Sequence, residues 1–245
     1  MTMWNGKKKA LTFSYDDAVS QDIRLIEIFN RYGLKCTFNM NSELLGVNGT
    51  LIRDGVEVTH YKNKPEDIRY IYDGHEVAAH SLTHPFLSDL PDDEIIRQVE
   101  QDRLNLSELV GYEVCGFAYP CSSPKNDPRT IEIVRQKTDV RYARTVETTM
   151  SFAPQKDLYF VRGSIYHHAQ WDKLFEMGER FLAAEEGEFY IWGHSYEFDI
   201  FPERWGIFEE FCKMMSSRPD IFYGTNKELF LSNDYQTMKY SLKSG

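Results

Sequence analysis

Two adjacent aspartates and a pair of histidines are the residues of this sequence best suited to chemistry. Asp16 and Asp17 follow an apolar run in "ALTFSYDD", and His80 and His84 stand four residues apart in "HSLTH". On a helical turn, that spacing places two imidazoles on one face, close enough to bind one metal ion. Two imidazoles and a carboxylate form a three-ligand set that leaves positions open for water and substrate.

The two aspartates are expected to have different roles, because neighbouring residues of an extended chain point to opposite faces. Asp17 is the candidate third ligand, and Asp16 is the candidate base that takes a proton from water. His194 ends an apolar run in "FYIWGHS" and is the candidate acid for a departing amine or alkoxide. Plainer explanations stay open: an Asx turn for the aspartates, and ordinary surface or core histidines.

The elements that must position these residues alternate between strand and helix patterns. We expect strands over 9–15, 35–41, 114–120, 140–146, 158–166, 188–195 and 221–225, and helices over 20–33, 90–111, 127–137, 171–187 and 203–217. This alternation predicts an α/β fold with a parallel sheet wrapped by helices. Chemistry in such folds gathers at the carboxyl ends of the strands. The strand-end residues predicted to contact substrate are Tyr15, Tyr119, Arg144 and Trp192.

The chain reads as a single domain over 1–245, because it contains no repeat, no low-complexity segment and no Pro/Gly-rich linker. One polar segment, at about 46–65, interrupts the strand–helix rhythm. It carries an Asp54-Gly55 turn between two β-type runs, which predicts a hairpin inserted at the rim of the fold. Insertions of this kind commonly shape substrate access.

The composition of the chain bears on which classes of partner it is expected to bind. The 245 residues carry a formal net charge of −10 and a pI of about 5.2, which gives no electrostatic reason to bind nucleic acid or an anionic membrane. No apolar run is long enough to cross a membrane, and the amino terminus lacks the pattern of a signal peptide. Four scattered cysteines without CxxC spacing are expected to be reduced. We therefore expect a cytoplasmic protein.

Five segments together resemble the polysaccharide deacetylase family (carbohydrate esterase family 4), which includes chitin and peptidoglycan deacetylases. "TFSYDDA" is similar to the family's "TFDDG", and "HSLTH", preceded by "DGHEVAA", matches its H-[ST]-x-x-H motif. "FAYPCSS", "IWGH" and "CTFNMN" are similar to its "RxPYG", "LH" and "ATFFV" segments. The likeness extends from Lys9 to Phe230.

The resemblance implies a distorted (β/α) barrel of about seven parallel strands. It also implies one divalent metal ion, zinc first, with cobalt, manganese, nickel or iron as alternatives. The implied reaction is hydrolysis of N- or O-acetyl groups on a carbohydrate. Carried over by position, Asp16 is the general base and His194 the general acid, and the metal ligands are Asp17, His80 and His84.

Three departures from the family pattern concern the catalytic groups. Ala118 stands where the family has the arginine that orients the base, and Arg162 is our candidate replacement. Cys121 follows the proline of the third motif, and the resemblance assigns its backbone N–H to stabilising the oxyanion. The Asp-Trp motif that steadies the acid histidine is not recognisable, so the partner of His194 is unassigned.

Other functions remain possible for such a chain. A metal-dependent hydrolase of another C–N bond, in a small amide or ring, would use the same residues. A non-catalytic carbohydrate-binding protein would keep cleft aromatics without needing the metal ligands. Nuclease and phosphatase sites usually carry more carboxylates and two metals. We expect an acetylated sugar or a small amide as partner, and we expect His60 and His75 to be bystanders.

Overall fold

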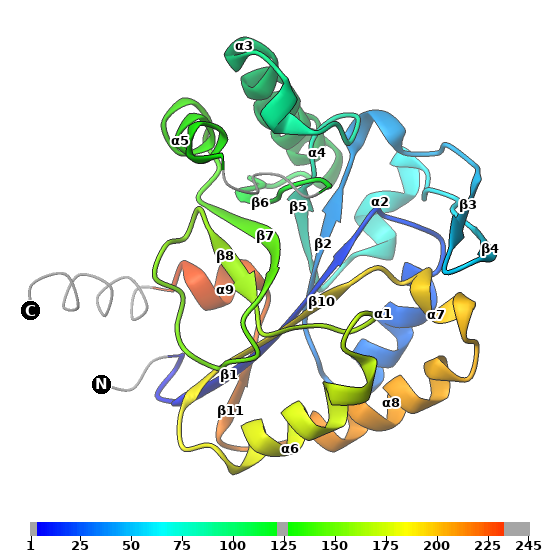
Figure 1. The fold of residues 1–245 in the computed structure, drawn as a ribbon, viewed down its shortest axis with the longest axis vertical. Coiled ribbons are helices and arrows are strands. Elements are labelled where there is room, and N and C mark those ends of the chain that lie inside the picture. Colours follow the sequence, from blue (N-terminus) through cyan, green and yellow to red (C-terminus); the bar gives the residue numbers. More distant parts are fainter. Residues whose placement is uncertain (1–3, 122–126, 233–245) are drawn as a thin grey trace, which may run out of the picture.

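The sheet of this protein is entirely parallel and curls almost into a barrel (Figure 1). The computed structural model describes residues 4–121 and 127–232, so Ser122 and Ser123 of the third motif lie outside the described residues. Within them the strands are β1 (Lys9–Asp16), β2 (Cys36–Met40), β5 (Glu76–Ala79), β6 (Gly116–Ala118), β7 (Tyr142–Thr148), β8 (Val161–Gly163), β9 (Ile165–Tyr166), β10 (Gly187–Gly193) and β11 (Ile221–Tyr223).

The order of the strands brings the two edges of the sheet together. They run β8-β7-β6-β5-β2-β1-β10-β9, and β11 also pairs with β1. β8 and β9 stand at opposite ends of this order, yet only Ser164 separates them in the chain. The Ser164 N–H donates to the Tyr190 carbonyl oxygen of β10 at 2.8 Å. The predicted distorted (β/α) barrel is therefore confirmed.

The described residues contain nine strands in this sheet rather than about seven. β5 was not predicted, because "EVAA" is too short to show a strand period. The predicted strand over 158–166 is two strands that meet at Ser164. At Gly163, just before this break, a Cβ atom would lie 2.4 Å from the Trp192 ring, so the chain needs glycine to pass.

Helices cover the outside of the barrel. They are α1 (Asp22–Arg31), α2 (Pro65–Ile71), α3 (Asp92–Ile96), α4 (Asp102–Val110), α5 (Pro128–Lys137), α6 (Leu174–Ala183), α7 (Glu197–Ile200), α8 (Arg204–Met215) and α9 (Asn226–Phe230). Every residue of β1 is buried, as expected for a strand enclosed on both faces. On its outer face, Phe13 packs against Phe29 of α1 and Phe208 of α8. No helix in the described ranges is both long enough and apolar enough to cross a membrane.

The predicted helix over 90–111 is present but is not uniform. α3 and α4 are joined by five residues of π-helix, Arg97–Gln101, here called the π segment. The helix ends at Gly111, whose φ of 76° is the left-handed conformation that favours glycine. Such π segments frequently occur at functional sites.

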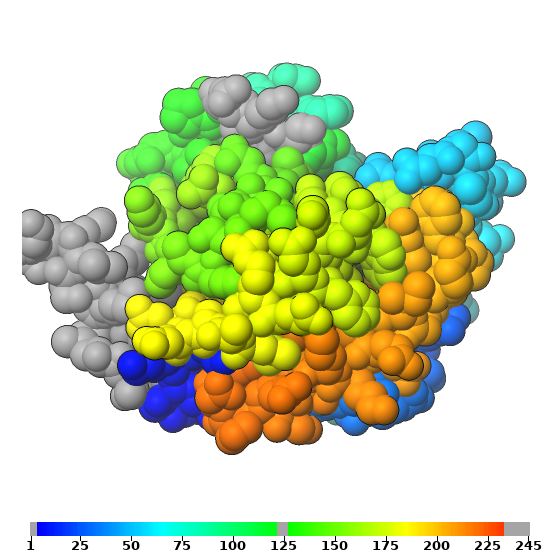
Figure 2. Space-filling model, turned by 60° about the horizontal axis from the view of Figure 1, so that its bottom comes forward, coloured from blue at the N-terminus to red at the C-terminus, as the bar shows by residue number. Residues whose placement is uncertain are grey.

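The rim segment forms an antiparallel hairpin of β3 (Thr50–Arg53) and β4 (Val56–Thr59). Asp54 and Gly55 form its two-residue turn, and both have positive φ, as a type I′ turn requires. The base of the hairpin packs against α7 through the buried side chains of Val58, Tyr196 and Ile200. Figure 2 shows the hairpin projecting from one side of the molecule, beside the segment that contains α7.

Candidate active site

A cavity of about 610 Å³ opens at the carboxyl ends of the strands. That size is typical of a small-molecule site. The aspartates that end β1, the histidines that follow β5 and β10, and residues of the hairpin all line it. Its polar and charged lining residues are Asp16, Asp17, Arg53, His60, Lys62, His80, His84, Cys121 and His194.

Asp17, His80 and His84 converge on one point of the cavity. Each offers a ligand atom, and these atoms all lie within 4.8 Å of one another. The Nδ1–H of His80 donates to the Ala118 carbonyl oxygen at 2.7 Å, which leaves the lone pair of Nε2 free to bind a cation. Burial lowers the pKa of His80 to about 4 and also lowers the pKa of His84. Both imidazoles are therefore neutral at pH 7, the form that binds metal.

The histidine pair lies on a loop and not on the helical turn that its spacing predicts. β5 ends at Ala79, and the backbone of both Ser81 and His84 is left-handed, with φ of 67° and 60°. The two imidazole rings of His80 and His84 still lie 4.8 Å apart, almost perpendicular to each other. The prediction of a helical turn was wrong, but the loop brings the rings equally close. Backbone strain of this kind persists where the surrounding structure enforces it.

The π segment and the start of α4 hold this loop. The Asp102 carboxylate accepts the His80 backbone N–H at 2.9 Å. The backbone oxygen of Gln98 accepts from the Leu82 N–H at 3.0 Å, and its side-chain oxygen accepts from the Thr83 N–H at 3.1 Å. The π segment widens the helix at this point, so the backbone and side-chain oxygens of Gln98 can both accept hydrogen bonds from the loop. The sequence gives no sign of this support.

Asp16 is a buried, ionised carboxylate. It accepts hydrogen bonds from Arg144 at 2.5 and 2.7 Å and from the Asn39 side chain at 2.7 Å. Burial alone would raise the pKa of Asp16, but Arg144 and two neighbouring imidazoles lower it below its usual value. The Arg144 guanidinium stacks over the Trp192 ring, with 4.4 Å from Cζ to the ring centroid. Asp16 is therefore held in one orientation with its charge in place.

Arg144 is the residue that meets Asp16, whereas Arg162 lies elsewhere. In the β6–β7 pair, Arg144 stands directly opposite Ala118, the position where the family carries its arginine. Because neighbouring strands are about 4.8 Å apart, an arginine one strand over can still reach the same carboxylate. The Arg162 side chain is 43% exposed and forms an ion pair with Glu147 at 4.0 Å. The assignments of Arg162 to orienting the base and of Arg144 to contacting substrate are both corrected.

Glu197 is the partner of His194 that the sequence did not reveal. Its carboxylate lies 3.2 Å from Nδ1 of His194, and the other nitrogen, Nε2, faces Asp16 at 3.9 Å. Glu197 is completely buried and also contacts His167 at 3.3 Å and the Tyr166 hydroxyl. Burial alone would lower the pKa of His194, but Glu197 and the two aspartates raise it to about 9. The His-x-x-Glu spacing at the start of α7 was the available signal.

Replacing Glu197 with glutamine is expected to lower the pKa of His194 below its wild-type value of about 9. Burial then acts without its main counter-charge, so the imidazole loses its proton at lower pH. NMR titration of the metal-free protein should show His194 titrating at about pH 9 in wild type. In Glu197→Gln, the alkaline fall of activity should move to lower pH. An unchanged His194 titration in the variant would refute the partnership.

The segment that follows β4 contributes two residues that contact Asp17. The Nζ of Lys62 lies 3.0 Å from one carboxylate oxygen, and Nε2 of His60 lies 3.3 Å from the other. Burial alone would raise the pKa of Asp17, but Lys62 and His60 hold it well below its usual value. The prediction that His60 is a bystander was wrong. His75 does lie apart, where its ring contacts Cys36 and Asn30.

Three other predicted residues occupy different surroundings. Tyr15 is fully buried among the outer helices, and its hydroxyl lies 3.1 Å from His167. It cannot contact substrate, because Tyr15 and Asp16 point to opposite faces of β1. Tyr119 and Trp192 both line the cavity wall. The Tyr119 hydroxyl, however, donates to a backbone carbonyl, so the ring is a fixed part of that wall.

Cys121 lies at the cavity edge with a left-handed backbone, φ 58°. Its sulfur is 3.5 Å from Nδ1 of His84, a proximity that the sequence did not indicate. Burial, followed by the charge of Asp17, raises the pKa of the Cys121 thiol. A raised pKa opposes a thiolate nucleophile, so the side chain is not the attacking group.

The parallel barrel therefore carries an Asp–His–His cluster at its strand ends, which is a candidate site for one cation. The sequence model of the polysaccharide deacetylase family matches residues 4–142, more than half of the chain. The chain belongs to the polysaccharide deacetylase family. A search of curated protein sequences found no match.

Solved structures share this fold at low sequence identity. A putative polysaccharide deacetylase from Mycobacterium smegmatis is 16% identical, with a TM-score of 0.63, over 98% of this chain and 91% of that one. The D285S mutant of the peptidoglycan deacetylase PdaC from Bacillus subtilis is 18% identical, with a TM-score of 0.56, over 97% and 96%. BA3943 from Bacillus anthracis, a CE4 family pseudoenzyme, is 14% identical, with a TM-score of 0.52, over 91% and 65%. One of these structures is a pseudoenzyme, so the same fold occurs both with and without catalysis.

Proposed function

We propose that this protein is a metal-dependent hydrolase that removes acetyl groups from a carbohydrate. The observation that carries the proposal is the convergence of Asp17, His80 and His84 beside a second, separately held carboxylate, Asp16. Neutral imidazoles and an ionised carboxylate are the donor set that zinc and similar divalent cations prefer. When bound there, a divalent cation would polarise the acetyl carbonyl and lower the pKa of a water molecule.

The protein's own groups then account for the proton transfers. Asp16 takes a proton from the attacking water while Arg144 keeps the carboxylate oriented. The water oxygen bonds to the acetyl carbon, and the backbone N–H of Cys121 is our candidate donor to the resulting oxyanion. His194, protonated through its contact with Glu197, gives its proton to the departing nitrogen or oxygen as the bond to the acetyl carbon breaks. The products are acetate and the free amine or hydroxyl.

His80→Ala is expected to lose both the metal and the activity, because two protein ligands bind a metal ion much more weakly than three. Metal content per chain, measured by mass spectrometry on proteins purified in parallel, should fall at least about tenfold. His75→Ala is the matched control, since His75 is also a buried histidine but lies outside the cavity. Equal metal content in wild type and His80→Ala would contradict the ligand assignment. A metal-loaded wild type that releases acetate from no acetylated sugar would contradict the activity.

A further inference from the structure

The tip of the rim hairpin forms polar contacts along one side of the cavity. Arg53, the last residue of β3, donates to the Tyr166 hydroxyl at 2.7 Å and lies 3.3 Å from Glu197. Asp54, in the turn, lies 2.8 Å from Nε2 of His168. The two contacts connect the hairpin to the segment that runs from β9 and to the start of α7. Arg53 and Tyr166 both line the cavity, so its wall is continuous from the hairpin to the barrel on this side.

The rest of the hairpin is fixed to the barrel as well. Its base packs in the apolar cluster with α7, and Lys62, shortly after β4, contacts Asp17 in the cavity. The Gln21 side chain donates to the Thr59 carbonyl oxygen at 2.9 Å. Polar, apolar and backbone contacts therefore all hold the hairpin in one position. A two-stranded hairpin alone is only marginally stable, so these contacts decide where it stands.

The reacting groups lie deep behind this wall. Asp16 is 3% exposed and His80 is 2% exposed, and the His194 side chain is 16% exposed. An acetyl group must therefore enter the cavity together with the sugar that carries it. A sugar inside a polymer has a neighbour on each side, and both neighbours need a way out. A terminal sugar needs one exit only.

We propose that the hairpin restricts this site to an acetylated sugar at the end of a chain or free in solution, and excludes sugars inside a polymer. Arg53 and Asp54 are the specificity-determining residues, because their contacts close the side through which a second neighbour would leave. Neither touches the reacting atoms. The inference rests on the proposed deacetylase activity and adds the position of the sugar in its chain.

The test maps where acetyl groups are lost. The metal-loaded wild type is incubated with β-1,4-linked N-acetylglucosamine oligomers from the monomer to the hexamer, and fragment-ion mass spectrometry locates each free amine. Loss confined to the monomer and to one terminal unit of the longer oligomers is the expected result. Loss at internal units at a similar rate would overturn the inference while leaving the deacetylase activity intact. Release of acetate from no member of the series would overturn the activity, and the inference with it.

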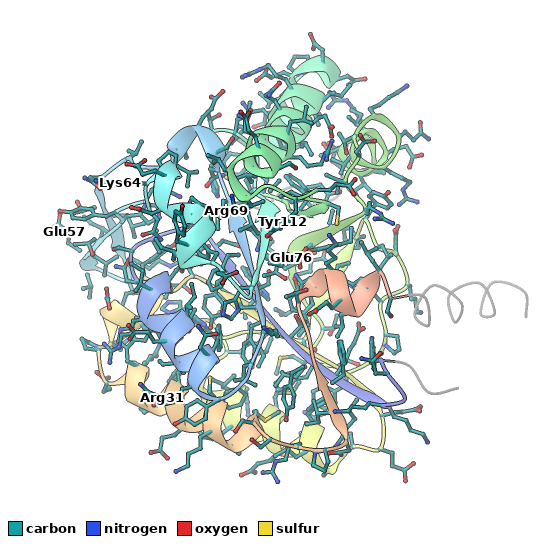
Figure 3. The ribbon with its side chains drawn as sticks, turned by 180° about the vertical axis from the view of Figure 1, so that it is seen from behind. Arg31, Glu57, Lys64, Arg69, Glu76 and Tyr112 are labelled. Atoms are coloured by element: carbon teal, nitrogen blue, oxygen red, sulfur yellow. The ribbon has the colours of Figure 1, made fainter. Side chains whose placement is uncertain are left out.

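The double variant Arg53→Ala/Asp54→Ala removes both ties. We expect the ratio of internal to terminal loss to rise by about tenfold, because the second exit opens. Glu57→Ala is the matched control: Glu57 lies on β4 and points away from the barrel at the outer edge of the hairpin (Figure 3), and its recorded contact is with Thr50. The control should keep the wild-type pattern. A double variant that stays folded, by circular dichroism, and keeps strictly terminal loss would overturn the roles of Arg53 and Asp54.

Discussion

Asp16→Asn is expected to bind metal as wild type does and to lose about 10²–10⁴-fold in the rate of acetate release. Asparagine keeps the shape of the side chain, and Asp16 is not among the three converging ligand atoms. The asparagine amide, however, cannot accept the proton of the attacking water. The loss should appear in kcat more than in KM, because a proton-transfer group acts in the transition state.

Two measurements on Asp16→Asn decide this prediction. Metal content should match wild type, which separates the variant from His80→Ala. Acetate release should be lost over the whole pH range, because the missing base cannot be restored by titration. If the variant kept a tenth or more of wild-type activity, another group would have to be the base. If it lost its metal, Asp16 would be a ligand as well.

Arg144→Ala is expected to destabilise the fold by about 3–5 kcal/mol, the usual result of leaving one member of a buried ion pair without its partner. Arg144 and Asp16 are both almost inaccessible to solvent, so little screening applies. Arg144 is the largest favourable influence on the lowered pKa of Asp16, so the pKa of Asp16 should rise in the variant. Urea unfolding followed by fluorescence measures the difference in unfolding free energy.

The pH dependence of that difference follows from the lowered pKa of Asp16. A carboxyl whose pKa is lower in the folded than in the unfolded state stabilises the fold above its unfolded pKa, about 4. This contribution is lost as the pH falls through the lower, folded value. Wild type and Arg144→Ala should therefore differ most near neutral pH and converge in acid. A constant difference down to the acid transition would mean that the cost is packing against Trp192, not charge.

A second substitution tests the strand register behind this pairing. Placing arginine at Ala118 in the Arg144→Ala background puts the guanidinium on the neighbouring strand, at the partner position. If a cation near Asp16 is what matters, Ala118→Arg/Arg144→Ala should recover part of the unfolding free energy that Arg144→Ala loses. Ala118→Leu in the same background is the control for added volume. Recovery by leucine as well would show that filling space, and not charge, is responsible.

The local part of the site could be predicted because each motif reports its own chemistry. The aspartates at the end of β1 and the His-x-x-x-His loop after β5 are short segments with recognisable residues, and only β2 separates their two strands in the sheet. The parallel strand–helix alternation placed the end of β1 at the carboxyl edge of one sheet, although β5 itself was not predicted. The family likeness named the same groups. The structure brings Asp17, His80 and His84 together.

What the sequence did not reveal depends on contacts across the fold. That Arg144 and not Arg162 meets Asp16 is set by the register between β6 and β7, and register has no signature in a single strand. Lys62 and His60 reach Asp17 because the hairpin folds back over the barrel, which depends on its packing against α7. β5 was not predicted, because its four residues are too few to show the alternation of a strand. Glu197 is the exception, since its spacing from His194 was visible.

The Lys62 contact links the hairpin to the affinity of the cluster for metal. The Lys62 ammonium and the His60 imidazole, just after β4, contact the two oxygens of the Asp17 carboxylate. A divalent cation that coordinated Asp17 would compete with the Lys62 ammonium for the same carboxylate and would be repelled by it. If a cation binds there, thermodynamic reciprocity makes the two effects equal: a cation that weakens the Lys62–Asp17 contact would itself be bound more weakly by the same amount. The segment proposed to select the substrate would thereby also influence how tightly a bound cation is held.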